Sequence, residues 1–126
     1  VALFGSRARG EARDDSDVDV FVVARDLERD PRRCQVSLRG VPWPPDVALV
    51  MRTPEEFLAD VHPLHLDLAL DARILFERDG FLTRHLARLR ELIDEARLYR
   101  RPDLFWRWKE QPVRRDWSIT WQGVQK

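Results

Sequence analysis

Two groups of residues near the start of the chain could do chemistry on a nucleotide. Gly5 and Ser6 interrupt a β-prone run with a turn, and ten residues separate this turn from Asp17-Val18-Asp19, which leads into a second β-prone run. Because side chains alternate faces along a strand, Asp17 and Asp19 are expected to point the same way. Carboxylates, phosphate oxygens and water are the ligands that Mg²⁺ prefers. The pattern therefore predicts a paired-carboxylate metal site beside a phosphate-binding turn.

The spacing of the two aspartates is compatible with one ion or with two. At a rise of about 3.3 Å per residue their Cα atoms lie about 6 to 7 Å apart, and the carboxylates can converge on one Mg²⁺ or on two ions about 3.5 to 4 Å apart. Gly5 lacks a Cβ and lets the backbone approach a phosphate. Ser6 supplies a hydroxyl and an N–H where a helix begins, which favours an anion. Arg7, Arg9 and Arg13 could add charge-assisted contacts.

Each part of this pattern also has an ordinary structural interpretation. Gly-Ser is a common turn, and an Asp-rich stretch such as Asp14-Asp15-Ser16 usually caps or solvates a loop. Two carboxylates on one face of a Val-rich strand are costly, however, unless they meet a metal or stay solvated. The combination therefore favours nucleotide binding.

The surrounding elements must position these residues. Hydrophobic patterning predicts strands over residues 1–4 and 18–23, joined by a turn and a short polar helix. Thr53, Pro54 and Glu56 have the spacing of an N-cap, a first-turn proline and a capping-box glutamate. The other predicted elements are a β-prone piece at 35–38, a rigid loop at 40–45, a strand from Asp46, helices over 54–61, 63–72 and 81–100, and a short strand at 73–77.

The segment GSRARGEARDDSDVDVFVV resembles the nucleotidyltransferase superfamily of DNA polymerase β type, and in particular its minimal, MNT-like members. The resemblance is strong over residues 1–23 and fair to about residue 80. It implies an α/β (α+β) nucleotidyltransferase fold, with a mixed β-sheet flanked by helices, a C-terminal helix and a Trp-rich tail. In that family a late strand lies beside the strands that bind metal, and the strand at 73–77 is the candidate.

The resemblance also implies roles for individual residues. Gly5 and Ser6 match the turn that holds the triphosphate, and Asp17 and Asp19 match the pair that binds two Mg²⁺ ions. Arg7 and Arg9 are further nucleotide-binding candidates, although an exposed arginine in a short helix is often only solvated.

The third carboxylate of the family is best matched by Asp46, which opens the run DVALV. Its implied role is metal ligation and general-base help to the attacking hydroxyl. Pro44 and Pro45 precede it where the family has an apolar strand residue, so a surface residue that begins a strand is the alternative.

The implied activity is transfer of a nucleoside monophosphate, in the first instance AMP from ATP, to a hydroxyl with release of pyrophosphate. Mg²⁺ is the implied ion and Mn²⁺ the substitute. Minimal members of the family often work with a helical HEPN-type protein as a toxin–antitoxin pair, sometimes by adenylylating it. That relation makes this chain an antitoxin-type partner and a protein the acceptor, while small-molecule acceptors and a homo-oligomer stay open.

Two interpretations from other classes remain open. One is a catalytically weak, nucleotide-binding partner subunit. The other is a nucleic-acid-binding domain led by the tail, in which Trp106, Trp108, Trp117 and Trp121 stand among arginines. Such aromatic side chains can stack on bases or cover a hydrophobic groove of the chain's own domain or of a partner, and the covering role is favoured. The balance of 22 acidic and 22 basic residues argues against indiscriminate nucleic-acid binding.

Length allows a single domain. The resemblance implies that this is a nucleotidyltransferase domain over residues 1–100, followed by a Trp/Arg-rich tail over 101–126. The family has a helix ahead of the first strand, so we expect residue 1 not to be the natural start of the fold. No run reaches the length of a membrane span and no signal peptide is visible, which predicts a cytoplasmic protein without a membrane partner. Cys34 is the single cysteine and cannot form an intrachain disulfide. The three histidines match no recognised ligand set.

Overall fold

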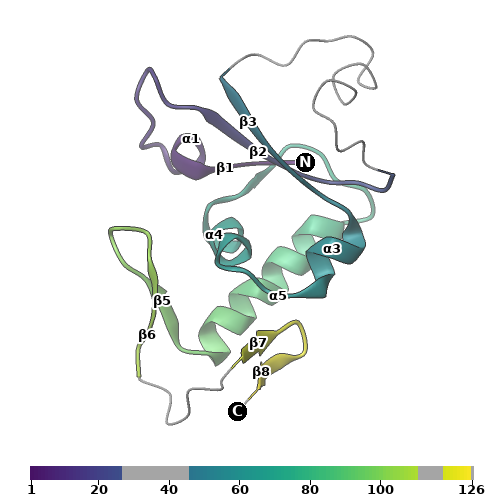
Figure 1. Ribbon diagram of the computed structural model, residues 1–126, viewed down its shortest axis with the longest axis vertical. Helices are drawn as coiled ribbons and strands as arrows, with labels where there is room; N and C mark the ends of the chain where they lie inside the picture. Colours follow the sequence, from purple (N-terminus) through teal and green to yellow (C-terminus); the bar gives the residue numbers. More distant parts are fainter. Residues whose placement is uncertain (27–45, 111–117, 126) are drawn as a thin grey trace. The chain divides into compact units, whose positions relative to one another are not determined.

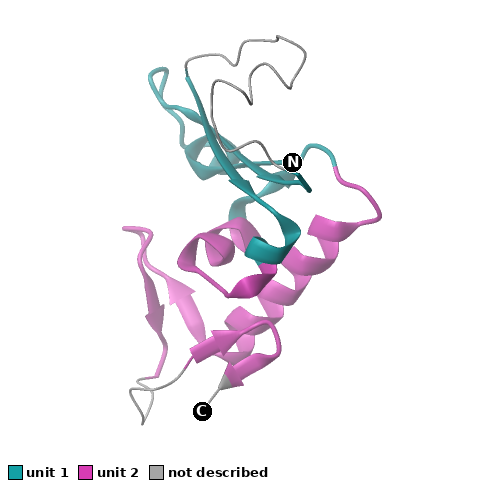
Figure 2. Cartoon of the chain, turned by 45° about the vertical axis from the view of Figure 1, so that its right-hand side comes forward, with its two compact units in different colours: residues 1–57, 71–76 teal, residues 58–70, 77–126 magenta. Residues whose placement is uncertain are grey.

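The computed structural model describes residues 1–26, 46–110 and 118–125 (Figure 1). The predicted β-prone piece at 35–38, the loop at 40–45, Cys34 and Trp117 lie outside the described residues. The chain divides into two compact units, one formed by Val1–Phe57 with Asp71–Phe76 and the other by Leu58–Leu70 with Glu77–Lys126 (Figure 2).

The first unit is built on a mixed four-stranded sheet. Its strands are β1 (Ala2–Phe4), β2 (Val18–Val23), β3 (Val47–Arg52) and β4 (Arg73–Ile74), in the order β3-β2-β1-β4. β2 runs parallel to β3, whereas β1 is antiparallel to both β2 and β4. Strand β4, which was predicted to span residues 73–77, is shorter than expected. It pairs with β1 and not with β2 or β3, the strands that follow Asp17 and Asp46.

The register of β1 and β2 places Asp19 next to the apolar core. Phe4 pairs with Asp19 across β1 and β2, and Ala2 pairs with Phe21. Phe21 is fully buried and packs against Phe57, with ring centroids 5.7 Å apart. Burial of one such side chain contributes about 1.5 to 3 kcal/mol. Since Asp19 lies two residues before Phe21, both point to the same face of β2, and Asp19 lies at the edge of the core.

A five-residue helix, α1 (Gly5–Arg9), follows β1 directly and ends at Gly10, whose φ of 74° is left-handed. The next helix of the described chain, α3 (Pro54–Ala59), begins with the predicted capping box. The Glu56 N–H donates to Thr53 Oγ1 at 3.2 Å, and the Thr53 hydroxyl donates to the Glu56 carboxylate at 3.0 Å. The local spacing of these residues was therefore sufficient to predict the start of α3.

The second unit packs two helices and two small hairpins. The helices are α4 (Pro63–Asp71, whose last residue belongs to the first unit) and α5 (Phe81–Glu95), and the hairpins pair β5 (Leu98–Arg100) with β6 (Trp106–Trp108) and β7 (Ser118–Thr120) with β8 (Gly123–Gln125). The predicted apolar stripe of α5 is buried, including Leu82, Leu86 and Leu89. The prediction that this helix continues to Arg100 is wrong. Arg97 takes a left-handed φ of 55°, and the next three residues pair as β5.

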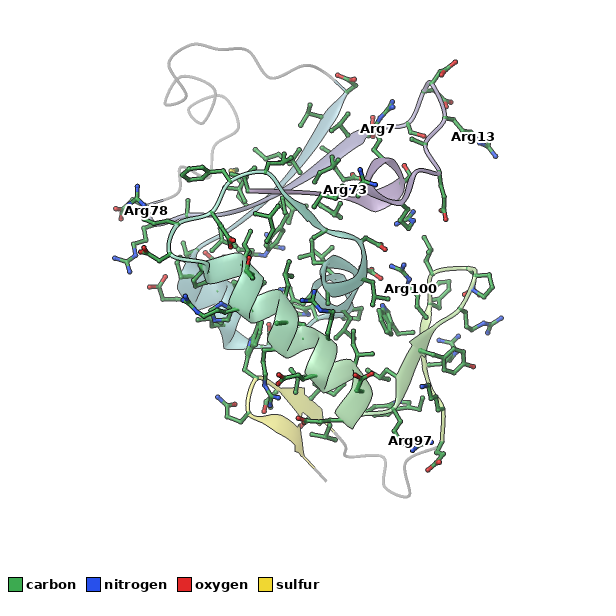
Figure 3. The ribbon with its side chains drawn as sticks, turned by 180° about the vertical axis from the view of Figure 1, so that it is seen from behind. Arg7, Arg13, Arg73, Arg78, Arg97 and Arg100 are labelled. Carbon is green, nitrogen blue, oxygen red and sulfur yellow. The ribbon has the colours of Figure 1, made fainter. Side chains whose placement is uncertain are left out.

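Two Trp side chains of the tail, Trp106 and Trp121, make polar contacts within this unit. Trp106 Nε1 donates to the carboxylate of Asp67 at 2.9 Å, and Arg100, labelled in Figure 3, donates to the same carboxylate at 3.2 Å. Trp121 Nε1 donates to the carbonyl of Asp60 at 3.1 Å. Among the described residues, no helix combines the length and the hydropathy that crossing a membrane requires.

Candidate functional site

Gly5 occupies a position that no other residue type could fill without rearrangement. Its φ of +73° is left-handed, and a Cβ built on it would lie 2.1 Å from Asp19 Oδ2. Real Cβ contacts are never this short, and a left-handed backbone disfavours side chains independently. The first turn of α1 therefore lies directly against the carboxylate of Asp19, the residue that pairs with Phe4. The absence of a Cβ at Gly5 makes this approach possible.

Ser6 follows Gly5 on the same turn. Its carbonyl accepts a hydrogen bond from the Glu11 N–H at 2.9 Å, which closes α1. Its hydroxyl makes no hydrogen bond to any residue in the described part of the chain. The backbone of Ser6 thus has a structural role, whereas its side chain can still contact a ligand.

Arg7 contacts the backbone of the loop that follows α1. Its Nη2 donates to the carbonyl of Ser16 at 2.8 Å and to that of Arg13 at 3.4 Å, as the side chain extends from α1 toward the following loop (Figure 3). Its Nε is buried and has no hydrogen-bond partner among the described residues. Arg7 holds the loop immediately before Asp17, and Ser16 Oγ further tightens that loop by accepting from the Arg13 N–H at 2.8 Å.

Asp17 and Asp19 lie close enough to interact electrostatically. Asp17 is exposed and precedes β2, while Asp19 is partly buried within it. Burial raises the pKa of Asp19, the negative charge of Asp17 raises it further, and the positive charge of Arg9 offsets part of that rise. The structure therefore holds an ionised Asp19 at an electrostatic cost, which a bound cation would relieve.

Asp46 lies at the same end of the sheet as Asp17. It is exposed and directly precedes β3, which therefore begins one residue later than predicted, and the Val18 N–H donates to the Asp46 carbonyl at 2.7 Å. Because Val18 pairs with Val47 in parallel register, Asp17 and Asp46 each come immediately before paired residues. This neighbourhood was visible in the sequence only as two acidic residues ahead of two β-prone runs.

Arg9 is held by two carboxylates. Its Nε donates to Glu11 and its Nη1 donates to Asp71, both at 3.2 Å. Asp71 is a component of this site that the sequence analysis missed. It stands at the C-terminal end of α4 and is separated from Arg9 by 62 positions, so no local spacing could reveal the contact.

The two carboxylates of the site are suitable ligands for a hard divalent cation such as Mg²⁺. Asp17 and Asp19 supply carboxylate oxygens, and phosphate oxygens are the ligands with which Mg²⁺ completes its coordination. No group of three His, Cys, Asp or Glu side chains in the described ranges is arranged as a metal site as it stands. His65, one of the histidines, is buried and accepts a hydrogen bond from the His62 N–H through Nδ1.

Comparisons with known proteins add three findings. Residues 1–99 match the family described as nucleotidyltransferase domain. The chain is 28% identical over 100 residues to a Methanocaldococcus jannaschii protein named "putative protein adenylyltransferase", an alignment that covers 74% of this chain and 68% of the relative. A solved structure described as a toxin–antitoxin with AMP-PNP aligns with a TM-score of 0.47 and 19% identity, over 74% of this chain and 72% of that one.

Proposed function

This chain belongs to the nucleotidyltransferase domain family, and on that premise we propose that it transfers AMP from ATP to a hydroxyl of a protein, with Mg²⁺ bound at Asp17 and Asp19. The family match confirms the resemblance inferred from the sequence, and the mixed sheet with its helices confirms the predicted fold class. Nucleotidyl transfer is the activity of the family and of this chain. The nucleotide, the ion and the acceptor are the finer parts of the proposal.

One observation carries the proposal most strongly, namely the close approach of Gly5 to Asp19. The left-handed backbone of Gly5, and the carboxylate oxygen that a Cβ would overlap, bring the first turn of α1 directly against Asp19. A phosphate that contacts this turn would lie beside a carboxylate that already carries an electrostatic cost from burial and from Asp17. A metal–triphosphate complex supplies both the cation and the oxygens that such an arrangement lacks.

The proposed reaction is an in-line displacement at the α-phosphorus. The acceptor oxygen forms a bond to that phosphorus, the bond to the bridging oxygen of the β-phosphate breaks, and pyrophosphate leaves with the bonding electrons. When bound, Mg²⁺ neutralises the charge that develops on the phosphate oxygens. Asp17 and Asp19 hold the ion, and Gly5 and Ser6 hold the triphosphate. Asp46 takes the proton of the acceptor hydroxyl, a role supported by its place beside Asp17 at the ends of β2 and β3.

A protein acceptor is supported by the name of the archaeal relative, which describes protein adenylylation. The sequence resemblance to minimal nucleotidyltransferases further points to a helical HEPN-type partner as that acceptor. A cytoplasmic setting follows from the same proposal, because ATP and such a partner are both cytoplasmic.

The test is transfer of label from α-labelled ATP, with Mg²⁺ or Mn²⁺, to a panel that contains the product of the adjacent gene, RNA and small hydroxyl compounds. Wild-type protein is compared with Asp17→Asn and with Asp15→Asn, a matched control in the exposed turn of the same loop. We expect labelling of a protein that Asp17→Asn abolishes and Asp15→Asn preserves. Label on RNA or on a small molecule would overturn the acceptor assignment. Tight binding of MgATP without any label would instead identify a nucleotide-binding partner subunit.

A further inference from the structure

We propose that Asp71 is a positioning residue for nucleotide binding, which holds the Arg9 guanidinium so that its remaining N–H groups face the triphosphate. This inference rests on the proposed function and assigns a role to a residue outside the motif that carries the family resemblance. Asp71 lies at the end of α4, where the chain returns to the first unit.

The Arg9–Asp71 ion pair is shielded from solvent. The distance from Arg9 Nη1 to Asp71 Oδ2 is 3.2 Å, and the two side chains are 17% and 6% exposed, respectively. In such surroundings a charge-assisted hydrogen bond is stronger and less screened by salt than on an open surface. A carboxylate this deeply buried needs its charge partner, so the pair restricts the Arg9 side chain to one geometry.

The second carboxylate on Arg9 provides an internal contrast. Glu11 accepts from Arg9 Nε at the same distance of 3.2 Å, but its side chain is 66% exposed. Exposed ion pairs contribute about 0 to 1 kcal/mol, because water screens them and both side chains lose conformational freedom. Two carboxylates thus contact the Arg9 guanidinium at equal distance. Because only Asp71 is buried, we expect Asp71, and not Glu11, to determine the position of the guanidinium.

Arg9 retains donors after both contacts are made. A guanidinium has five N–H groups, and within the described residues the hydrogen bonds of Arg9 use only its Nε and Nη1. Arg9 lies on α1, the helix whose first residue, Gly5, lies directly against the Asp19 carboxylate. The Nη2 end can therefore donate to phosphate oxygens bound next to Asp19.

Positioning of Arg9 before the nucleotide binds has an energetic consequence. A free arginine side chain loses rotamer entropy when it is fixed in one position. The contact with Asp71 imposes that loss during folding, so it is not repeated when the nucleotide binds. Removal of the Asp71 charge should consequently weaken nucleotide binding while the chemical groups at the reacting phosphorus stay in place.

The experiment measures the dissociation constant of ATP with Mg²⁺ by calorimetry for four forms of the full chain. These are the wild type, Asp71→Asn, Glu11→Gln as the matched control on the same guanidinium, and Asp71→Glu as the conservative variant. We expect Asp71→Asn to raise Kd about tenfold, the effect of one charge-assisted hydrogen bond. Glu11→Gln should change it by less than about twofold, and Asp71→Glu should restore most of the affinity.

A double variant separates positioning from a general loss of structure. If Asp71 acts through Arg9, adding Asp71→Asn to Arg9→Gln should change Kd by less than about twofold. In the label-transfer assay, Asp71→Asn should raise KM for ATP and leave kcat nearly unchanged. Circular dichroism and a melting curve show whether each variant is folded. If Asp71→Asn does not fold, Asp71→Glu still tests the role of the Asp71 carboxylate.

Two results would overturn the inference and are distinguishable. Wild-type protein that fails to bind MgATP overturns the proposed function itself, and the positioning role with it. Wild-type and Asp71→Asn proteins that bind MgATP equally, or effects of Arg9→Gln and Asp71→Asn that simply add, overturn only the role of Asp71.

Discussion

Asp19 of β2 and Arg88 of α5 both have raised pKa values, but the physical causes are opposite. Burial and the charge of Asp17 raise the pKa of Asp19, which disfavours its ionised form. Hydrogen bonds to Glu95 and Glu91 raise the pKa of Arg88, which favours its ionised form. The ionised carboxylate of Asp19 is thus destabilised by its surroundings, whereas the charge of Arg88 on α5 is stabilised by neighbouring carboxylates.

Local contacts reinforce this contrast. Arg88 donates to Glu91, to Glu95 and to the carbonyl of Trp121, each at 3.0 Å. It lines an open hollow of about 340 Å³ together with Leu58, Arg84, His85, Trp121 and Gln122. The hollow contains basic side chains, as the Asp19 site does, but Arg88 already has its carboxylate partners. Uncompensated charge, and not the density of charged residues, distinguishes the candidate nucleotide site.

The largest expected effect comes from substitution of the glycine that makes the approach to Asp19 possible. Gly5→Ala should abolish nucleotidyl transfer, because the new Cβ overlaps Asp19 Oδ2, and left-handed strain should lower the free energy of unfolding by about 1 to 3 kcal/mol. Gly10→Ala is the matched control, since Gly10 has a φ of +74° but no atom within 4 Å of a built Cβ. Urea denaturation and label transfer measure both variants. Equal activity of the two would remove the geometric argument for the site.

Next in size is the effect of neutralising Asp19. Its folded pKa is raised above the unfolded value, so the native state binds more protons between the two values, and the free energy of unfolding decreases as pH rises through that window. At neutral pH, Asp19→Asn should therefore raise the melting temperature of the metal-free protein, while it removes the additional stabilisation by MgATP.

Melting curves from pH 4 to 8, with and without MgATP, measure this sign. Asp15→Asn, in the exposed turn of the same loop, should leave both quantities nearly unchanged. A lower melting temperature for metal-free Asp19→Asn at neutral pH would contradict the assignment of Asp19 as a destabilising charge.

A smaller effect is expected on the compensated side of the comparison. Arg88→Met keeps an apolar stem but removes three hydrogen bonds, and should lower the free energy of unfolding by about 1 kcal/mol at low salt. The loss should shrink in 1 M salt, because screening weakens the wild-type ion pairs. Nucleotidyl transfer should be unaffected. Arg84→Met, on the same helix, is the control, since the contact of Arg84 is to the carbonyl of Asp79.

The smallest effect is expected at Glu77, which has the opposite pH dependence to Asp19. Hydrogen bonds from Thr83, whose N–H donates at 2.9 Å, lower the pKa of Glu77. Its stabilising contribution is present above the unfolded pKa and is lost as pH falls through the folded one. Glu77→Gln should slightly lower the melting temperature at neutral pH and have little effect at pH 3. A rise at neutral pH would remove the contrast with Asp19.

Much of the fold followed from local rules. The β2 bounds, the start of α3 and the buried stripe of α5 were predicted because alternation, capping and helical periodicity depend only on nearby residues. The C-terminal limit of α5 was not, because β5 forms by pairing with β6, and such pairing competes with helix propensity. The short β4 was overestimated for a similar reason, as its length depends on which β1 residues it can pair with.

The sequence by itself indicated which residues are candidates for a nucleotide site, because glycine tolerates a left-handed turn and side chains two positions apart near a strand start point the same way. Tertiary structure decided what each charge interacts with. It directed Arg7 to backbone carbonyls of the loop before Asp17 and paired Arg9 with Asp71, far along the chain. The physical reason is that Coulomb interactions and desolvation depend on distance and burial, and both are set by packing between residues that the sequence separates.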